Sequence, residues 1–257
     1  IGDEVGMPEA AAELGARHIP QVACNKQGTP LVSSIFALAR QASHSPVLVY
    51  VNADILFLPD MVQSARQALS LADRFLLIGQ RWNLDIHQRL DFSPGWDERL
   101  LVDLQRRGEL HPPRGSDYFI FPRQCFTDIP DFAIGRAGWD NWMIYHALKS
   151  GMLTLDATPS IKAIHQNHDY RHLDGGRPHY DLEESKINRR LAGGKSHMYI
   201  LLDTNRQLID GQVRRTPLTP QRLIRRLELR LYPSHGDLKG WRRLLIRRLR
   251  RLRRGVI

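Results

Sequence analysis

The segment that most constrains the fold of this chain runs from Val47 to Asp60. Its first five residues, Val47 to Val51, are all apolar or aromatic, and the chain then changes abruptly to Asn52-Ala53-Asp54. Such a run is typical of a strand that is buried on both faces of a sheet. Ligand sites of open α/β sheets lie at the carboxyl ends of strands, and a carboxylate there is costly unless it is hydrogen-bonded or bound to a metal. The pattern therefore predicts a functional role for Asp54.

Apolar segments with strand character alternate with amphipathic segments along most of the chain. We expect strands at 18–22, 47–51, 75–79, 117–121, 153–157, 161–164 and 198–202, and helices at 9–14, from 29, at 59–71, 93–107, 138–148 and 181–191. This alternation predicts an α/β domain with a mixed, mostly parallel sheet flanked by helices. Because Ile1 to Glu4 resemble the end of a strand, we expect a further strand and helix to precede this chain.

The positive charge is concentrated at the C-terminal end. Residues 214–257 contain fifteen lysines and arginines against two acidic residues, whereas residues 1–213 contain 22 basic and 25 acidic residues. We therefore divide the chain into a nearly neutral domain, 1–213, and a basic helical tail, 214–257. The two cysteines, Cys24 and Cys125, are too few and too far apart for a disulfide framework or a zinc site, which favours a reducing compartment.

The tail has the pattern of two amphipathic helices, 222–230 and 239–254. In the second, apolar residues recur at steps of three and four with arginines between them: Trp241, Leu245, Leu249, Leu252 and Val256. A helix of this kind binds the interface of an anionic membrane; a docking helix for a protein partner is the alternative. Nucleic acid is disfavoured, because the rest of the sequence has no recognition motif or aromatic platform. The sequence contains no stretch of about 18 apolar residues, which is the length that a transmembrane helix needs. We therefore expect a cytoplasmic protein that binds membranes peripherally.

Polar clusters stand at the ends of several predicted elements. Besides Asn52-Ala53-Asp54 there are four, in chain order Asp3-Glu4, 115–118 (Gly-Ser-Asp-Tyr), 138–141 (Gly-Trp-Asp-Asn) and 165–169 (His-Gln-Asn-His-Asp). Their order and spacing resemble glycosyltransferases of the GT-A fold, close to the large family-2-like group. Those enzymes carry a short acidic motif, often Asp-x-Asp, after a central strand, where it holds a divalent metal on the diphosphate of a nucleotide sugar. Asn52-Ala53-Asp54 matches that motif with Asn in place of the first acid, and the resemblance covers roughly residues 1–170.

The resemblance implies an inverting transfer of a sugar from a nucleoside-diphosphate sugar to a hydroxyl of a glycan or lipid-linked acceptor. Asp54 and His165, with His168 as the next candidate, would bind Mn²⁺ or Mg²⁺, which offsets the charge developing on the leaving diphosphate. Asp140, at a helix start, matches the carboxylate that acts as general base in inverting members, and backbone N–H groups there should keep it ionised. Asp3 would contact the nucleobase.

Further residues are candidates for binding the substrates. Asn25 precedes a helix whose N-terminus would face the nucleotide, and Asn52 is a second candidate for bonding to it. Asp117, Trp139 and Asn141 are candidates for contacts with the donor sugar or the acceptor, Trp139 through the face of its ring. Each has a structural alternative, because polar residues of these types also cap turns and helices and most tryptophans pack in cores.

Two other classes of function stay open from the sequence. A nucleotidyltransferase shares a related scaffold and also places a metal on phosphates, although it usually has a glycine-rich phosphate loop near its first strand. A non-catalytic carbohydrate- or membrane-binding protein of the same fold would explain the loss of the first acid of the motif. Metal-dependent binding of a nucleoside diphosphate that vanishes in Asp54→Ala would favour the transferase.

Overall fold

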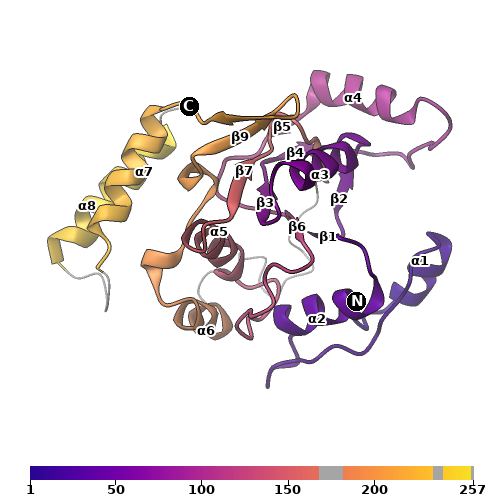
Figure 1. Ribbon diagram of the computed structural model, residues 1–257, viewed down its shortest axis with the longest axis horizontal. Coiled ribbons are helices and arrows are strands. Elements are labelled where there is room, and N and C mark those ends of the chain that lie inside the picture. Colours follow the sequence, from indigo (N-terminus) through magenta and orange to yellow (C-terminus); the bar gives the residue numbers. More distant parts are fainter. Residues whose placement is uncertain (168–181, 234–239, 256–257) are drawn as a thin grey trace.

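The chain forms two β-sheets that are flanked by helices. The computed structural model describes residues 1–167, 182–233 and 240–255 (Figure 1). The larger sheet has the strand order β1 (Val47–Val51), β6 (Tyr118–Pro122), β3 (Phe75–Ile78), β7 (Leu153–Asp156), β9 (Arg206–Ile209) and β10 (Gln212–Arg215). The smaller sheet has the order β2 (Ile55–Phe57), β8 (Ala163–Gln166), β4 (Arg81–Leu84) and β5 (Glu109–Leu110).

Both sheets contain parallel and antiparallel pairs, which confirms the predicted mixed sheet, but antiparallel pairs outnumber parallel ones among the described strands, so the expectation of a mostly parallel sheet is wrong. Strands β3 and β7, β7 and β9, and β4 and β8 run parallel. The other described pairs are antiparallel, because β6 lies reversed between β1 and β3 and because β9 and β10 form a hairpin. The hairpin turns at Asp210 and Gly211, which both have positive φ (50° and 73°), the conformation that an Asp-Gly pair accommodates.

The expectation that the 47–51 strand is buried on both faces is wrong, because β1 lies at the edge of its sheet. Leu48 is buried, but Val49 and Val51 are 40% and 38% exposed. The central strands β3 and β6 match that expectation instead, since every residue from Phe75 to Ile78 and from Tyr118 to Phe121 is at most 1% exposed.

Helices cover both faces of the larger sheet, α2 (Val32–Ala42) and α5 (Trp139–Lys149) on one face and α3 (Asp60–Leu71) on the other. The other described helices are α1 (Met7–Glu13), α4 (Trp96–Arg107), α6 (Glu183–Leu191), α7 (Pro220–Leu231) and α8 (Gly240–Gly255). Alternate residues of the strands point to opposite faces. Phe119 and Phe121 therefore pack with α2 and α5, whereas Tyr118 and Ile120 pack with α3 and the second sheet.

Three expected elements differ from the structure. Residues 18–22 form no strand, and the expected helix at residue 29 begins only at Val32, because Pro30 and Leu31 are held in β-bridges to Cys24 and Ala133. Residues 198–202 contain the start of a 3₁₀ turn, η4 (Leu201–Asp203), rather than a strand. The Asp203 carboxylate stabilises this turn by accepting a hydrogen bond from the Ile200 N–H at 2.8 Å.

The basic C-terminal segment is joined closely to the rest of the molecule. The expected boundary after Val213 falls within β10, and α7 and α8 pack side by side at one side of the molecule (Figure 1). Arg225 of α7 pairs with Asp203 at 2.8 Å, and Arg222 lies 3.7 Å from Asp156 at the end of β7. Among the described helices, none is long and apolar enough to cross a bilayer.

Candidate functional site

Polar residues from distant parts of the chain meet at one edge of the larger sheet. Because β6 is antiparallel to β1, the residue before β6 lies beside the residue after β1. The Asn52 backbone N–H donates to the Asp117 carbonyl at 3.0 Å, and the Asn52 side-chain amide donates to the Asp117 carboxylate at 3.1 Å. Asn52 and Asp117, two predicted site residues, are therefore direct partners.

Asp117 is buried and forms an ion pair with Arg81. The Arg81 guanidinium, which belongs to β4 of the smaller sheet, donates to Asp117 Oδ1 at 2.6 Å. Both side chains are largely inaccessible, so the pair is a strong determinant of local geometry. Asn52 and Arg81 both donate to Oδ1, which leaves Oδ2 directed away from these two contacts.

Tyr50 is partly buried and lies within electrostatic reach of three carboxylates. Its hydroxyl donates to Asn52 Oδ1 at 2.9 Å, and its ring packs edge-on against Trp139. Burial raises the pKa of the Tyr50 hydroxyl, and the negative charges of Asp117, Asp140 and Asp54 raise it further. A single phenol is thus within electrostatic reach of carboxylates from the start of β6, the start of α5 and the turn after β1.

The predicted metal-binding residues lie in contact with each other. Strand pairing of β2 with β8 places Ile55 opposite His165, and His165 Nε2 lies 3.2 Å from Asp54 Oδ2. Two ligands at right angles on an octahedral Mg²⁺ or Mn²⁺ ion are about 3 Å apart. The spacing of these two atoms therefore fits joint binding of one divalent cation.

The donor set around Asp54 is small. Within the described ranges, no group of three or more His, Cys, Asp or Glu side chains is arranged to hold a metal. His168, the second histidine candidate, lies outside the described residues. The Asp54 side chain is partly exposed and His165 is buried behind it. A cation held by this pair would keep several positions for water and phosphate oxygens, as Mg²⁺ commonly does.

Asp140 lies in the first turn of α5, as predicted. The helix begins after Gly138, whose φ of 116° is accessible to glycine but strained for other residues. Asp140 Oδ1 accepts from the Gly138 N–H at 3.3 Å. Burial raises the pKa of Asp140 to about 6, the N–H groups of Asn141 and Gly138 lower it, and Asp117 raises it. Burial thus outweighs the helix N-terminus, contrary to the expectation that the helix dominates.

Two predicted substrate contacts have structural roles. Trp139 is buried in the core against Tyr50 and Phe119, so the prediction that its ring face binds an acceptor is wrong. The Asn141 side-chain amide donates to the Tyr199 carbonyl at 2.8 Å and the Asn141 carbonyl accepts from the Tyr199 N–H, which ties α5 to the segment before η4. The Asn141 side chain is therefore engaged with Tyr199, whereas its backbone N–H contacts the Asp140 carboxylate.

Asp3 and Asn25 lie apart from the other predicted residues. Asp3 is exposed and lines a separate hollow with Cys24, Gly28 and other residues of the N-terminal segment. Asn25 Oδ1 accepts from the N–H groups of Gln27 and Thr29, and its amide donates to Glu184 of α6. Asn25 therefore shapes a loop in the described structure and is not part of the Asp117 cluster.

Three residues of the cluster were not among the predicted site residues: Tyr50, Arg81 and His111. Tyr50 could have been found, because strand alternation puts it on the same face as Asn52. No local sequence pattern marks Arg81 as a site residue, because its contact with Asp117 depends on how distant strands pair. His111, whose pKa is lowered by burial and by Arg81 and raised by Asp117, lies next to β5. It begins the segment that leads to Asp117.

Comparisons with known proteins identify no relative of the chain: no protein-family model, no curated protein and no solved structure matches it. The chemistry of the site itself is therefore the basis for inferring a function. The site contains a half-buried carboxylate of raised pKa, a carboxylate–imidazole pair spaced for one cation, and a carboxylate held by an arginine. This combination suits proton removal next to a metal-bound anion.

Proposed function

We propose that this chain is a glycosyltransferase of the GT-A type. It would transfer a sugar from a nucleoside-diphosphate sugar to a hydroxyl of a glycan or lipid-linked acceptor, with inversion at the anomeric carbon. The observation that carries the proposal is that Asp117 is bonded through Asn52 to the Tyr50 hydroxyl, whose pKa is raised by Asp117, Asp140 and Asp54 together. The family resemblance assigns Asp54 to the metal and Asp140 to the base, and Asp117 is the candidate for a contact with the donor sugar or the acceptor.

Asp140 is the proposed general base. With a pKa of about 6 it is largely ionised at neutral pH, yet it is a stronger base than an ordinary aspartate. As the acceptor oxygen bonds to the anomeric carbon, its proton passes to Asp140 and the bond from that carbon to the diphosphate oxygen breaks. The electron pair of that bond leaves with the diphosphate.

Asp54 and His165 are the residues that would hold a divalent cation. When bound, Mn²⁺ or Mg²⁺ supplies Lewis-acid stabilisation of the diphosphate leaving group. Asp117 would bind a hydroxyl of the donor sugar through Oδ2, since Arg81 and Asn52 already donate to Oδ1. Arg81 is a positioning residue, because it fixes the Asp117 carboxylate without facing the reacting atoms.

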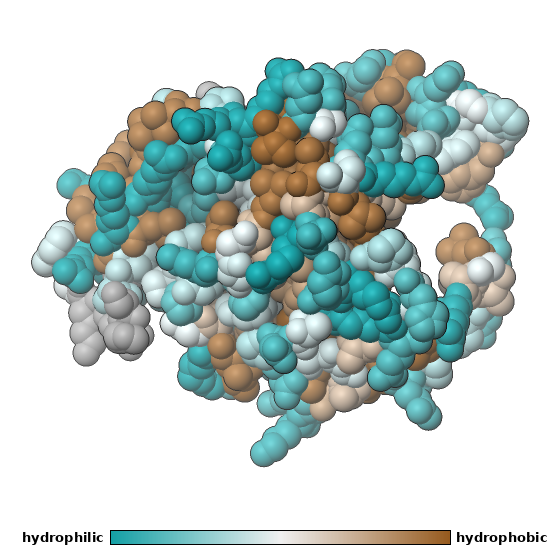
Figure 2. All heavy atoms as spheres, in the orientation of Figure 1, coloured by the Kyte–Doolittle hydropathy of each residue, from teal (hydrophilic) through white to brown (hydrophobic). Residues whose placement is uncertain are grey.

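We also propose that the protein works at an anionic membrane surface. The hairpin of α7 and α8 exposes large apolar side chains, and Figure 2 shows this apolar surface interspersed with hydrophilic side chains. The exposed set is Leu223, Leu227, Trp241, Leu244, Leu245 and Leu252. Arginines such as Arg247 and Arg251 are exposed on the same helices. Apolar residues among arginines match an interface of acyl chains beneath anionic headgroups.

The basic segment buries charged side chains as well as exposing apolar ones. In the hairpin, the side turned toward the protein contains charged residues, and Arg222, Arg225, Glu228 and Arg253 are buried. Of the expected apolar stripe, Trp241, Leu245 and Leu252 are exposed, whereas Val256 lies outside the described residues. The ion pairs orient the leucines outward.

The test of the proposed function measures nucleotide binding and transfer separately. Mn²⁺ together with a panel of nucleoside diphosphates should raise the melting temperature of the wild-type chain, and Asp54→Asn should abolish the metal-dependent part. Asp140→Asn should retain that stabilisation but lose transfer from the matching nucleotide sugar. Full transfer by Asp140→Asn contradicts the base assignment. Release of pyrophosphate from a nucleoside triphosphate and a sugar phosphate would favour the nucleotidyltransferase alternative.

A further inference from the structure

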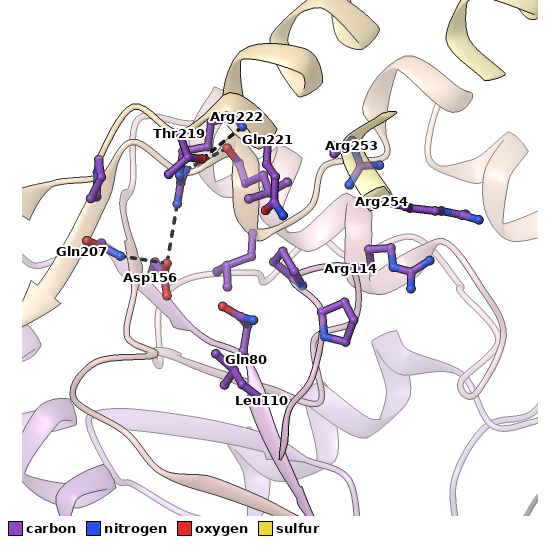
Figure 3. Close-up of a pocket in the computed structure, with 15 residues that line it drawn as sticks. Gln80, Leu110, Arg114, Asp156, Gln207, Thr219, Gln221, Arg222, Arg253 and Arg254 are labelled. Atoms are coloured by element: carbon purple, nitrogen blue, oxygen red, sulfur yellow. Dashed lines mark hydrogen bonds and ion pairs between the residues drawn. The ribbon is translucent and has the colours of Figure 1, made fainter. Parts of the chain in front are cut away.

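A cavity of about 520 Å³ lies between the helical hairpin and the rest of the protein, outside the carboxylate cluster (Figure 3). Its polar lining is Gln80, Arg114, Asp156, Gln207, Thr219, Gln221, Arg222, Arg253 and Arg254. Figure 3 shows Arg114, Arg253 and Arg254 toward one end, and Asp156 and Gln207 toward the other. Its volume falls in the usual range for sites that bind small molecules.

The charge of this lining is strongly positive, with four arginines against one aspartate. Two of the arginines are balanced: Arg222 lies 3.7 Å from Asp156, and Arg253 donates to the buried Glu228 at 2.7 Å. Within the described residues, the guanidinium groups of Arg114 and Arg254 have no carboxylate in ion-pair range. The cavity therefore carries a surplus of positive charge that a bound anion would compensate.

The cavity and the candidate active site lie next to each other. The segment 111–117 joins them, because Arg114 lines the cavity and Asp117 belongs to the carboxylate cluster. Gln80, which follows β3, donates to the His111 carbonyl at 2.6 Å and also lines the cavity. Strands β3 and β7 both end here, at the edge where open α/β sheets bind ligands.

We infer that this cavity binds a phosphate or diphosphate group carried by the acceptor. Guanidinium groups match phosphate oxygens in bidentate geometry. The glutamine and threonine side chains are further hydrogen-bonding groups for a phosphorylated ligand. Phosphate binding by the cavity does not depend on the proposed function. Only the assignment of that phosphate to the acceptor molecule rests on it. A phosphate bound here would bring the hydroxyl of the same molecule toward Asp140 along the 111–117 segment.

The experiment measures pyrophosphate binding by calorimetry in the full chain. Asp54→Asn is present throughout and EDTA is added, so that the cation site contributes nothing. Arg114→Gln combined with Arg254→Gln removes the two arginines that have no carboxylate partner in the part of the chain that the structure describes. Arg17→Gln combined with Arg66→Gln is the matched control, because it removes the same charge from exposed positions outside both the cavity and the hairpin of α7 and α8.

We expect the Arg114/Arg254 variant to bind pyrophosphate at least about tenfold more weakly, since each lost contact is a charged hydrogen bond, and the control to bind as the parent does. Equal weakening in both variants, or no binding by the parent, overturns the inference.

Vesicles containing phosphatidic acid distinguish a lipid headgroup from a soluble phosphorylated acceptor as the source of the phosphate. Two results together would identify the ligand as a lipid headgroup. Pyrophosphate would displace the protein from these vesicles, and the cavity variant would lose more vesicle binding than the control. Pyrophosphate binding without such competition assigns a soluble phosphorylated acceptor. If pyrophosphate binding is lost as expected but transfer never occurs, the cavity stands and the proposed function fails.

Discussion

Asp140→Asn should make the protein more stable while it removes transfer activity. The amide keeps the shape of the side chain and can still accept the hydrogen bond from the Gly138 N–H. It removes the negative charge of a half-buried group that interacts unfavourably with Asp117. A carboxyl group whose pKa is raised from 3.8 to about 6 costs the folded state about 3 kcal/mol at pH 7.5.

The sign of this effect depends on pH. A raised pKa means that the fold favours the protonated acid, so the penalty is absent below pH 3.8 and grows as pH rises through about 6. The stability gained in Asp140→Asn should therefore be about 3 kcal/mol at pH 7.5 and about 1.5 kcal/mol at pH 5. For a chain of this size each kcal/mol shifts the melting temperature by about 2–4 °C.

Thermal and urea unfolding of wild type and variant at pH 7.5 and pH 5 measure this difference. Asp97→Asn is the matched control, because Asp97 follows Gly95-Trp96 in the first turn of α4 just as Asp140 follows Gly138-Trp139 in α5. Removing an ordinary acid from a helix start should cost about 0.3–1 kcal/mol. A destabilised Asp140→Asn, or a gain that is the same at both pH values, would refute the reasoning. Transfer should fall by about 10²–10⁴-fold.

Three further results are expected. Arg81→Gln should destabilise the chain by about 3 kcal/mol in urea unfolding, because it leaves the buried Asp117 carboxylate without its cation. Adding Asp117→Asn should recover part of this loss, and strictly additive losses of stability in the double variant would count against the ion pair. Glu228→Gln, at a carboxylate that is 0% exposed, should destabilise by a similar amount; an unchanged urea midpoint would contradict the packing of the hairpin. Leu223→Ser combined with Leu227→Ser should weaken binding to anionic vesicles while the melting temperature changes little, and unchanged sedimentation with vesicles would exclude this face as the membrane contact.

Apolar runs and helical periodicity in the sequence predict several helices and strands of the structure. The central strand at Phe75 and the helices α3, α4 and α5 follow from apolar runs and periodic stripes. The hairpin of β9 and β10 also has a local signal, since Asp210-Gly211 is a favoured turn pair. The signal of strand β4 is weak, because Arg-Trp-Asn-Leu alternates polar and apolar residues over only four positions, and the strand is held by pairing with β8 and β5.

The candidate site was predictable residue by residue but not as an arrangement. The sequence indicated Asp54, Asp117 and Asp140 through their positions at element ends, and the strand order then set which of them are neighbours. The orientation of the basic hairpin was not predictable, because periodicity defines an apolar stripe but not which side is buried. That choice depends on Glu228, Asp203 and Asp156, which pair with its arginines from α7 itself and from the body.

The most direct test of the central claim is the anomalous-scattering map of a crystal that contains Mn²⁺ and a nucleoside diphosphate. The account predicts one manganese peak within coordination distance of both Asp54 Oδ2 and His165 Nε2, with diphosphate oxygens completing its shell and the Asp140 carboxylate facing the same space. A diphosphate bound away from this edge of the sheet, with no manganese at Asp54, would contradict it.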